Sequence, residues 1–255
     1  MAATKTVRVP KAYFVISDHQ STKSAVLEYI ANMKSLSKAS QKLGESLANL
    51  HLHNINLGKR LSKHSNWVGK GRDENNEYIS KFGFHCATSC GYIPMVNEWH
   101  NDWVAFYARF RLEDKINGVL ENCGDRELRE LWSKLQIIIP NFFKDCVDNQ
   151  IVPSLLHGDL WNGNAGETGE TDETPIIFDP SSFYGHSEYD LALARVFGGF
   201  RSRYFDTYHS VIKKAPLFDK RCELYELFHN LNHWQHFGNS YRSRSINIMK
   251  QLCKN

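Results

Sequence analysis

The sequence lacks the features that mark secreted, membrane-spanning or nucleic-acid-binding chains. Its 255 residues hold only six cysteines and no Cys-x-x-Cys pair, so a disulfide scaffold is not indicated. No apolar run approaches the ~20 residues that cross a bilayer, and the first residues carry no secretory signal. Lysine and arginine exceed aspartate and glutamate by only three, 31 against 28, so neither nucleic acid nor an anionic membrane is expected as a partner. We expect a soluble, cytoplasmic protein. The sequence does not determine its oligomeric state.

Only two of the cysteines are close together. Cys86 and Cys90 form a C-x-x-x-C pattern, which could supply half of a zinc site. No second pair lies at a matching distance, so reduced, inert thiols are the favoured interpretation.

Enough apolar material is present for a folded core, with 42% hydrophobic and 13% aromatic residues. β-rich runs predict strands at residues 12–17 and 25–30. A helix is then expected from Ser35 or Ser37, because leucines and alanine recur at three- and four-residue steps. Residues 57–76 are polar and predict a loop.

The rest of the chain favours helices. Apolar spacing predicts helices over 102–112 and 125–135, with Asp102 and Asp125 as N-caps. Beyond residue 189 the pattern is again mostly helical. The segment between residues 155 and 180 fits neither pattern.

This segment carries the residues suited to phosphoryl transfer. It reads LLHGDLWNGN from residue 155, and a β-rich run at 175–178 then ends in Asp179. Phosphoryl transfer needs a carboxylate that takes the acceptor hydroxyl proton, and oxygen ligands that hold Mg²⁺ on the phosphates. Asp159 would be the base, and Asn164 and Asp179 the metal ligands. Asp and Asn in loops are often only turn residues, but the spacing and order here match a kinase catalytic loop.

Longer motifs extend this similarity. LLHGDLWNGN and IIFDPSSFYGHSEYDLALARVFGGF, together with KLGESLANLHLHN, FGFHCATSCGYIPMVNEW and LNHWQHFG, resemble the fructosamine kinase family of ketosamine-3-kinases, which includes protein-ribulosamine 3-kinases. The resemblance implies an α+β, protein-kinase-like fold of the aminoglycoside-phosphotransferase type, with a β-rich N-terminal lobe and a mostly helical C-terminal lobe. It also implies ATP and Mg²⁺ as cofactors.

The implied activity is ATP-dependent phosphorylation of the 3-hydroxyl of a ketosamine, ribulosamine or fructosamine, on glycated protein lysines or small amines. The product is unstable and eliminates, which restores the amine. By the same resemblance Asp159 is the proton acceptor, and Asn164 and Asp179 bind magnesium. Ribulosamine and fructosamine are not distinguished.

Further site residues follow from the same motifs. The resemblance places Glu28, Tyr29 and Ile30 at the interlobe hinge that contacts adenine, and Trp161 in the sugar pocket. It makes Asp190 a structural support of the catalytic loop, which His157 is also expected to brace.

Several aromatic residues could belong either to the hydrophobic core or to the functional site. Trp99, Trp103 and Trp234 are expected in the core, with Trp234 also a candidate substrate contact. His229, His233 and His236 recur at helical spacing and could hold a metal. An aromatic face lining the cleft or core is favoured.

The sequence departs from the family at its start. The glycine-rich loop and phosphate-binding lysine are not found, so we expect residues 1–31 to be a remnant of the N-terminal lobe and hinge, and 32–255 the catalytic lobe. Gly69-Lys70-Gly71 is a poor substitute for that loop. A catalytically weak chain that acts as a ligand- or protein-binding module is therefore the alternative.

Overall fold

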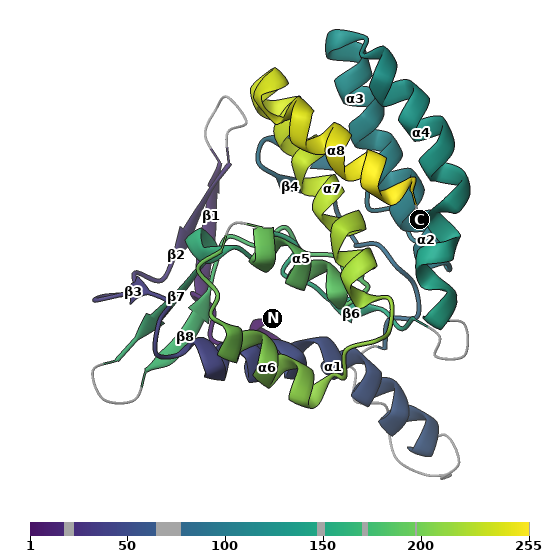
Figure 1. Ribbon diagram of the computed structural model, residues 1–255. Coiled ribbons are helices and arrows are strands. Elements are labelled where there is room, and N and C mark those ends of the chain that lie inside the picture. The colour runs from purple at the N-terminus through teal and green to yellow at the C-terminus, as the bar shows by residue number, and fades with distance from the viewer. Residues whose placement is uncertain (18–22, 65–77, 147–150, 170–172, 197, 255) are drawn as a thin grey trace.

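The computed structural model describes residues 1–17, 23–64, 78–146, 151–169, 173–196 and 198–254. A small β-rich part lies at one side of a larger helical body (Figure 1). The boundary expected between residues 31 and 32 stays a prediction.

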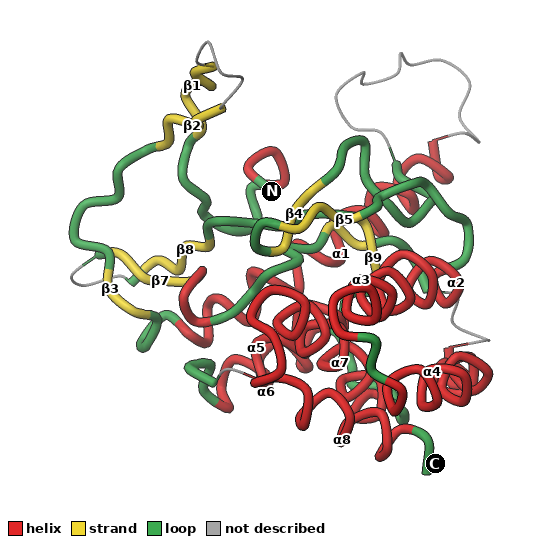
Figure 2. The backbone as a smooth tube through the Cα atoms, turned by 90° about the horizontal axis from the view of Figure 1, so that it is seen from above, coloured by secondary structure: helices red, strands yellow, loops and turns green. Residues whose placement is uncertain are grey.

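The β-rich part is a two-stranded antiparallel hairpin that projects from the body (Figure 2). It consists of β1 (Ala12–Ser17) and β2 (Lys23–Leu27). The first strand is confirmed, whereas the second ends at Leu27 rather than at residue 30. The hairpin is exposed on both faces, since every residue of β1 is exposed to solvent.

The segment before the hairpin is joined to the body through Arg8. After a short 3₁₀ turn, η1 (Ala2–Thr4), only Arg8 forms a β-bridge, to Ile176. The Arg8 guanidinium donates to Thr168 Oγ1 over 3.0 Å and to Glu28 Oε1 over 3.3 Å. Arg8 therefore ties the hairpin to the body through side-chain bonds, which a strand pattern does not reveal.

Short strands surround the segment expected to carry the chemistry. They form a sheet of order β3-β7-β8 and two separate pairs, β4 with β5 and β6 with β9. The strand predicted at 175–178 is confirmed as β8, which ends just before Asp179. The bounds are β3 (Lys34–Ser35), β4 (Thr88–Cys90), β5 (Ile93–Met95), β6 (Ser154–Leu155), β7 (Ala165–Thr168), β8 (Thr174–Ile177) and β9 (Tyr184–Gly185).

Helix α1 (Ser40–His64) differs from its prediction at both ends. Neither Ser35 nor Ser37 is its cap, because the first helical hydrogen bond runs from Leu43 N–H to the Ala39 carbonyl. The Glu167 carboxylate of β7 accepts the backbone N–H groups of Ser37 and Ala39 just before the helix, each over 2.8 Å. At the other end the helix continues through the first residues of the predicted loop. Residues 65–76 of that loop lie outside the described part.

The remaining helices build the body. The predicted caps are confirmed, since the Asp102 carboxylate accepts Ala105 N–H and the Asp125 carboxylate accepts Leu128 N–H. The helix predicted at 102–112 is longer and contains a π-helical stretch. The helical bounds are α2 (Trp103–Tyr107), the π-helix η2 (Ala108–Glu113), α3 (Asp114–Cys123), α4 (Arg126–Ile138), η3 (Ile139–Cys146), η4 (Asn162–Asn164), α5 (Glu188–Val196), α6 (Ser202–Val211), α7 (Phe218–Phe237), η5 (Gly238–Tyr241) and α8 (Arg242–Leu252).

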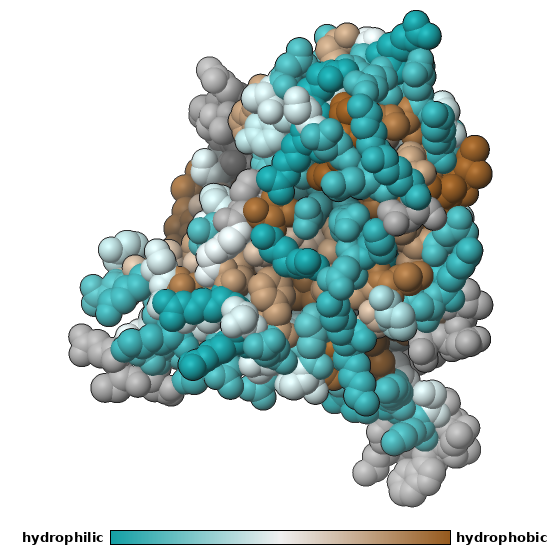
Figure 3. Space-filling view, in the orientation of Figure 1, coloured by the Kyte–Doolittle hydropathy of each residue, from teal (hydrophilic) through white to brown (hydrophobic). Residues whose placement is uncertain are grey.

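An aromatic cluster fills the centre of the body. Trp103 is buried as predicted and stacks near Tyr107 and Phe183, and its indole N–H donates to Tyr225 over 2.9 Å. Trp99, also predicted in the core, is 41% exposed. Hydrophilic residues dominate the face in Figure 3. Within the described residues, no helix combines the length and apolar character needed to cross a membrane.

Candidate active site

The segment between β6 and β7 forms a tight loop with buried leucine anchors. Leu156 and Leu160 are fully buried on either side of Gly158. Gly158 has φ +84°, a conformation that favours glycine, and a Cβ there would collide with the carbonyl oxygen of Ser181. The loop therefore packs closely against the chain that follows Asp179.

Asp190, at the start of α5, braces this loop. Its buried carboxylate accepts the backbone N–H of His157 over 2.7 Å and of Gly158 over 2.8 Å. His51 Nε2, from α1, lies 3.2 Å from Oδ2 of the same carboxylate. The other ring nitrogen, His51 Nδ1, lies 2.9 Å from the Tyr208 hydroxyl. Burial raises the pKa of Asp190, but hydrogen bonding and charge from His51 outweigh it and hold the pKa below its usual value. The expected supporting position of Asp190 is matched by this geometry.

His157 is also placed as a brace. Its Nε2 lies 3.0 Å from the Phe178 carbonyl oxygen and its Nδ1 lies 3.3 Å from the Asp159 nitrogen. Burial lowers the pKa of His157, so the ring is neutral, with Nε2–H donating and Nδ1 accepting. His157 thus links the loop to the end of β8.

The three residues expected to carry the chemistry are brought together. Asn164 Nδ2 donates to Asp159 Oδ2 over 3.1 Å and to the Asp159 backbone oxygen over 2.9 Å. The same nitrogen lies 3.4 Å from the backbone oxygen of Asp179. Because the amide nitrogen is engaged by these groups, the amide oxygen of Asn164 is the atom left to serve as a ligand.

Asp159 sits in an electrostatic environment that suits a proton acceptor beside a cation. Burial and the charge of Asp179 raise the pKa of Asp159 to about 6. Two neighbouring carboxylates repel each other, and a divalent cation relieves that repulsion. The oxygen donors of Asn164 and Asp179 are the type that Mg²⁺ prefers, so this donor set fits a magnesium ion.

The backbone of Asp179 is held in an unusual conformation. Its φ of +55° lies in the left-handed region, which Asp and Asn enter more readily than other non-glycine residues. The turn begins directly after β8 and brings Asp179 beside Asn164, which precedes β7. The pairing of Ala165 with Ile177 in the β7–β8 ladder fixes this approach.

A cavity of about 200 Å³ opens beside Asp159. Trp161, the residue predicted for a sugar pocket, lines this cavity and packs so closely over Gly163 that a Cβ there would strike the indole. The full lining is Cys90, Gly91, Asp159, Trp161, Asn232, His233, His236 and Phe237.

Trp234 is not where a substrate contact would be. It is 2% exposed, its indole N–H donates to Asn239 over 3.1 Å, and it does not line the cavity. Helical periodicity turns Trp234 into the core and its neighbours His233 and His236 toward the cavity, so the core interpretation holds. His229 is buried, and burial lowers its pKa to about 3.

Sequence reasoning missed Cys90 and Phe237 as cavity residues. Cys90 Sγ lies 3.9 Å from Asp159 Oδ1. The β4–β5 hairpin that contains Cys90 is anchored by the buried Arg111, which donates to Val96 O and Asn97 Oδ1, each over 2.7 Å. The quoted motifs FGFHCATSCGYIPMVNEW and LNHWQHFG contain both residues. Nothing in their spacing shows that the two segments meet.

The three residues expected at the hinge directly follow β2, the second strand of the projecting hairpin. Glu28 N–H donates to Lys11 O over 2.8 Å, and its carboxylate accepts from Arg8 and from Lys11 N. Tyr29 is 88% exposed and Ile30 is partly buried. An adenine contact by the Glu28 backbone would therefore use its carbonyl oxygen.

The alternative metal sites gain no support. Gly69-Lys70-Gly71 lies outside the described residues. Cys86 is exposed and Cys90 buried, both as free thiols. Across the described ranges, no three His, Cys, Asp or Glu side chains are grouped to hold a metal ion.

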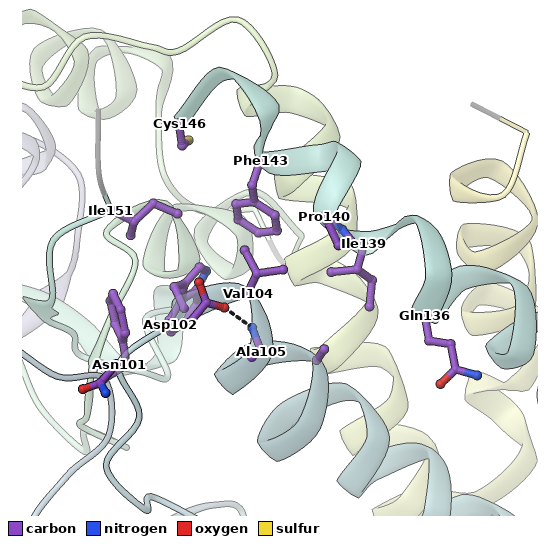
Figure 4. Close-up of a pocket in the computed structure, with 13 residues that line it drawn as sticks. Asn101, Asp102, Val104, Ala105, Gln136, Ile139, Pro140, Phe143, Cys146 and Ile151 are labelled. Carbon is purple, nitrogen blue, oxygen red and sulfur yellow. Dashed lines mark hydrogen bonds between the residues drawn. The ribbon is translucent and has the colours of Figure 1, made fainter. Parts of the chain in front are cut away.

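A larger cavity, of about 570 Å³, lies elsewhere, between α2 and η3 (Figure 4). Val104, Ile139 and Phe143 point into it. Among the described residues that line it, the carboxylate is that of Asp102, which accepts Ala105 N–H as the cap of α2. The smaller cavity beside Asp159 is therefore the site suited to chemistry.

Comparison with known proteins identifies the family of this chain. The family profile "Fructosamine kinase" matches residues 1–255. A mouse ketosamine-3-kinase is 51% identical over 252 residues, which cover 98% of this chain and 79% of the mouse protein. A chloroplastic protein-ribulosamine 3-kinase of rice (Oryza sativa subsp. indica) is 32% identical over 254 residues, which cover 100% of this chain and 66% of the rice protein.

Solved structures share the fold. A Haemophilus somnus protein assigned as a fructosamine-3-kinase superposes with a TM-score of 0.74 at 21% identity, covering 98% of this chain and 75% of that one. An ADP-bound aminoglycoside phosphotransferase superposes with a TM-score of 0.51 at 13% identity, covering 97% and 75%. The expected kinase-like α+β fold of the aminoglycoside-phosphotransferase type is confirmed, and the chain belongs to the fructosamine kinase family.

Proposed function

We propose that this chain transfers the γ-phosphoryl group of ATP to the 3-hydroxyl of a ketosamine on a glycated amine. The observation that carries the proposal is the convergence of Asp159, Asn164 and Asp179 beside a sugar-sized cavity. Relatives named ketosamine-3-kinase and protein-ribulosamine 3-kinase support the substrate class. The phosphorylated adduct then eliminates and restores the amine. A cytoplasmic location stays a prediction.

Asp159 acts as the proton acceptor. The 3-hydroxyl oxygen attacks the γ-phosphorus, its proton moves to the Asp159 carboxylate, and the bond to the β-phosphate oxygen breaks to release ADP. Burial makes this carboxylate more basic, which favours proton uptake near neutral pH. The bond from Asn164 Nδ2 to Oδ2 fixes the carboxylate plane, and Oδ1 is the oxygen beside Cys90 at the cavity wall.

Asn164 and Asp179 would hold magnesium through their side-chain oxygens. When bound, the ion neutralises phosphate charge and fixes the γ-phosphate. The left-handed backbone of Asp179 and the Asn164 bonds to Asp159 hold both ligands in place before substrate arrives. Such preorganisation is the main protein contribution to phosphoryl transfer.

The two ends of the β7–β8 hairpin would receive the two ends of the nucleotide. Arg8 connects Glu28 of the expected hinge to Thr168 at one end. Asn164 and Asp179 flank the other end. Three strand steps of ~3.3 Å separate these ends by about 10 Å. We therefore place adenine at Glu28, Tyr29 and Ile30, and the phosphates at the metal ligands.

The test is turnover with defined substrates. Protein, ATP and Mg²⁺ are incubated with ribuloselysine or fructoselysine peptides, and both ADP release and the gain of one phosphate group by mass are measured. We expect phosphorylation that disappears in Asp159→Asn. Folded protein that phosphorylates neither peptide would contradict the proposal.

A further inference from the structure

The cavity beside Asp159 is divided into a buried floor and an exposed edge. Cys90 and Asn232 of the floor are 6% and 3% exposed, and Asn232 Nδ2 donates to the Cys90 carbonyl over 3.2 Å. At the edge, Phe237 is 64% exposed and Tyr92, next to the lining residue Gly91, is 72% exposed. A contiguous exposed apolar patch beside a ligand cavity marks a candidate binding surface.

The exposed edge is rigidly built. Tyr92 N–H donates to His236 Nε2 over 3.2 Å, and His236 Nδ1 lies 2.7 Å from the Asn232 carbonyl. The Tyr92 and His236 rings pack at 4.2 Å. Gly91 has φ +73°, and a Cβ there would strike His236. The β4–β5 turn is thus fixed against α7. We call Tyr92, His236 and Phe237 the aromatic rim.

Phe237 completes the rim from the last turn of α7. Its ring packs 5.7 Å from His236 and stacks at 5.7 Å on His233, with 21° between the planes. Gly238, at φ +76°, ends the helix directly after it. Phe237 is therefore packed against His233 and His236 on one side, while most of its ring is exposed to solvent.

The size of the cavity limits what can enter. At about 200 Å³ it is smaller than the ~300–1,000 Å³ pockets that hold drug-sized ligands. A monosaccharide adduct fits this scale, whereas a polypeptide does not. When a glycated lysine presents its sugar to Asp159, the alkyl stem and neighbouring backbone must therefore lie over the edge of the cavity.

Resting on the proposed function, we infer that the aromatic rim binds the polypeptide around a glycated lysine, so that protein-bound ketosamines are preferred over small ones. Flat aromatic surfaces contact alkyl stems and peptide groups without demanding a particular sequence. Rigid support from His236 and His233 lowers the entropy cost of that contact.

The experiment compares two substrates that share one sugar. Nα-acetyl-ribuloselysine is the small substrate, and a peptide with several residues on both sides of ribuloselysine is the large one. The wild type is expected to show a higher kcat/KM for the peptide. Tyr92→Ser and Phe237→Ser should each lower the ratio of peptide to small-substrate kcat/KM by about tenfold. Ile137→Ser, at a 76% exposed position of α4, is the matched control and should keep the ratio.

The outcomes separate the rim from the reaction. Equal losses on both substrates, or an unchanged ratio in both rim variants, would overturn the rim assignment while leaving the activity intact. If the wild type turns over neither substrate, the proposed function fails. Calorimetry of peptide binding to the Asp159→Asn protein, with and without Tyr92→Ser, then tests the rim assignment. Weaker binding by the variant that carries Tyr92→Ser supports the assignment, and unchanged or undetectable binding overturns it.

Discussion

Asn164 Nδ2 and Asp159 Oδ2 are joined by a hydrogen bond of 3.1 Å. This bond connects the residue assigned to metal binding with the one assigned to proton transfer. Because the amide nitrogen is engaged with Asp159, the amide oxygen is the atom left to face a cation. The Asn164 side chain thereby orients both the Asp159 carboxylate and its own amide oxygen.

Asp159→Asn removes the proton acceptor while keeping the size of the side chain. We expect kcat to fall by about 10²–10⁴-fold, the usual contribution of a general base, with little change in ATP affinity. Steady-state kinetics and nucleotide titration measure the two effects. Glu45→Gln, at an exposed position of α1, should behave like wild type. Near-normal kcat in Asp159→Asn would exclude a base role.

Asp179 allows the metal role to be separated from backbone strain. Asp179→Asn keeps a residue that tolerates φ +55° but removes a charged ligand. We expect the Mg²⁺ concentration for half-maximal activity to rise by about tenfold or more. Asp179→Ala adds backbone strain and should also lower the melting temperature. An unchanged Mg²⁺ requirement in both variants would argue against ligation by Asp179.

Asp190 should matter for stability as well as rate. Asp190→Asn leaves the buried N–H groups of His157 and Gly158 and the ring of His51 poorly paired. We expect the free energy of unfolding to fall by about 3 kcal/mol and kcat to fall more than KM changes. Urea denaturation provides the measurement. Glu130→Gln, in an exposed ion pair with Arg126, should change little, and equal effects would refute the bracing role.

Two glycines with positive φ separate conformational strain from crowding. Gly124 has φ +62° and open space around a Cβ, whereas a Cβ at Gly158 meets Ser181 O. Gly124→Ala should cost about 1 kcal/mol of unfolding free energy. Gly158→Ala should cost clearly more and reduce activity as well. Thermal melts of the two variants make the comparison, and similar melting temperatures would show that the loop relaxes.

Stability should decrease in acid because His186 is buried and neutral. Burial lowers the pKa of His186 to about 4, despite the opposing charge of Glu188, compared with ~6.5 in an unfolded chain. As pH falls below 6.5 the unfolded state binds a proton that the folded state does not. This difference removes about 3 kcal/mol by pH 4. His186→Asn, which cannot titrate, should flatten the pH dependence of the unfolding free energy between pH 6.5 and 4, and an equally steep dependence would contradict this.

Local patterns determined much of the site and of the helical boundaries. The motif from His157 to Asn164 and the strand that ends just before Asp179 predicted which residues would lie together, because their spacing lies within one loop and one hairpin. Asp102 and Asp125 were identified as caps for the same reason, since a cap bonds only to the backbone two or three residues later.

Tertiary structure decided what depends on contacts between distant segments. The start of α1 is set by Glu167, which is 128 residues from Ala39. Arg8 donates to Thr168, which is 160 residues away in the chain. The cavity edge exists only because His236 of α7 meets Tyr92 of the β4–β5 turn. Such pairings leave no periodic signal along the chain, because burial and hydrogen bonding between remote residues arise only once the chain has packed.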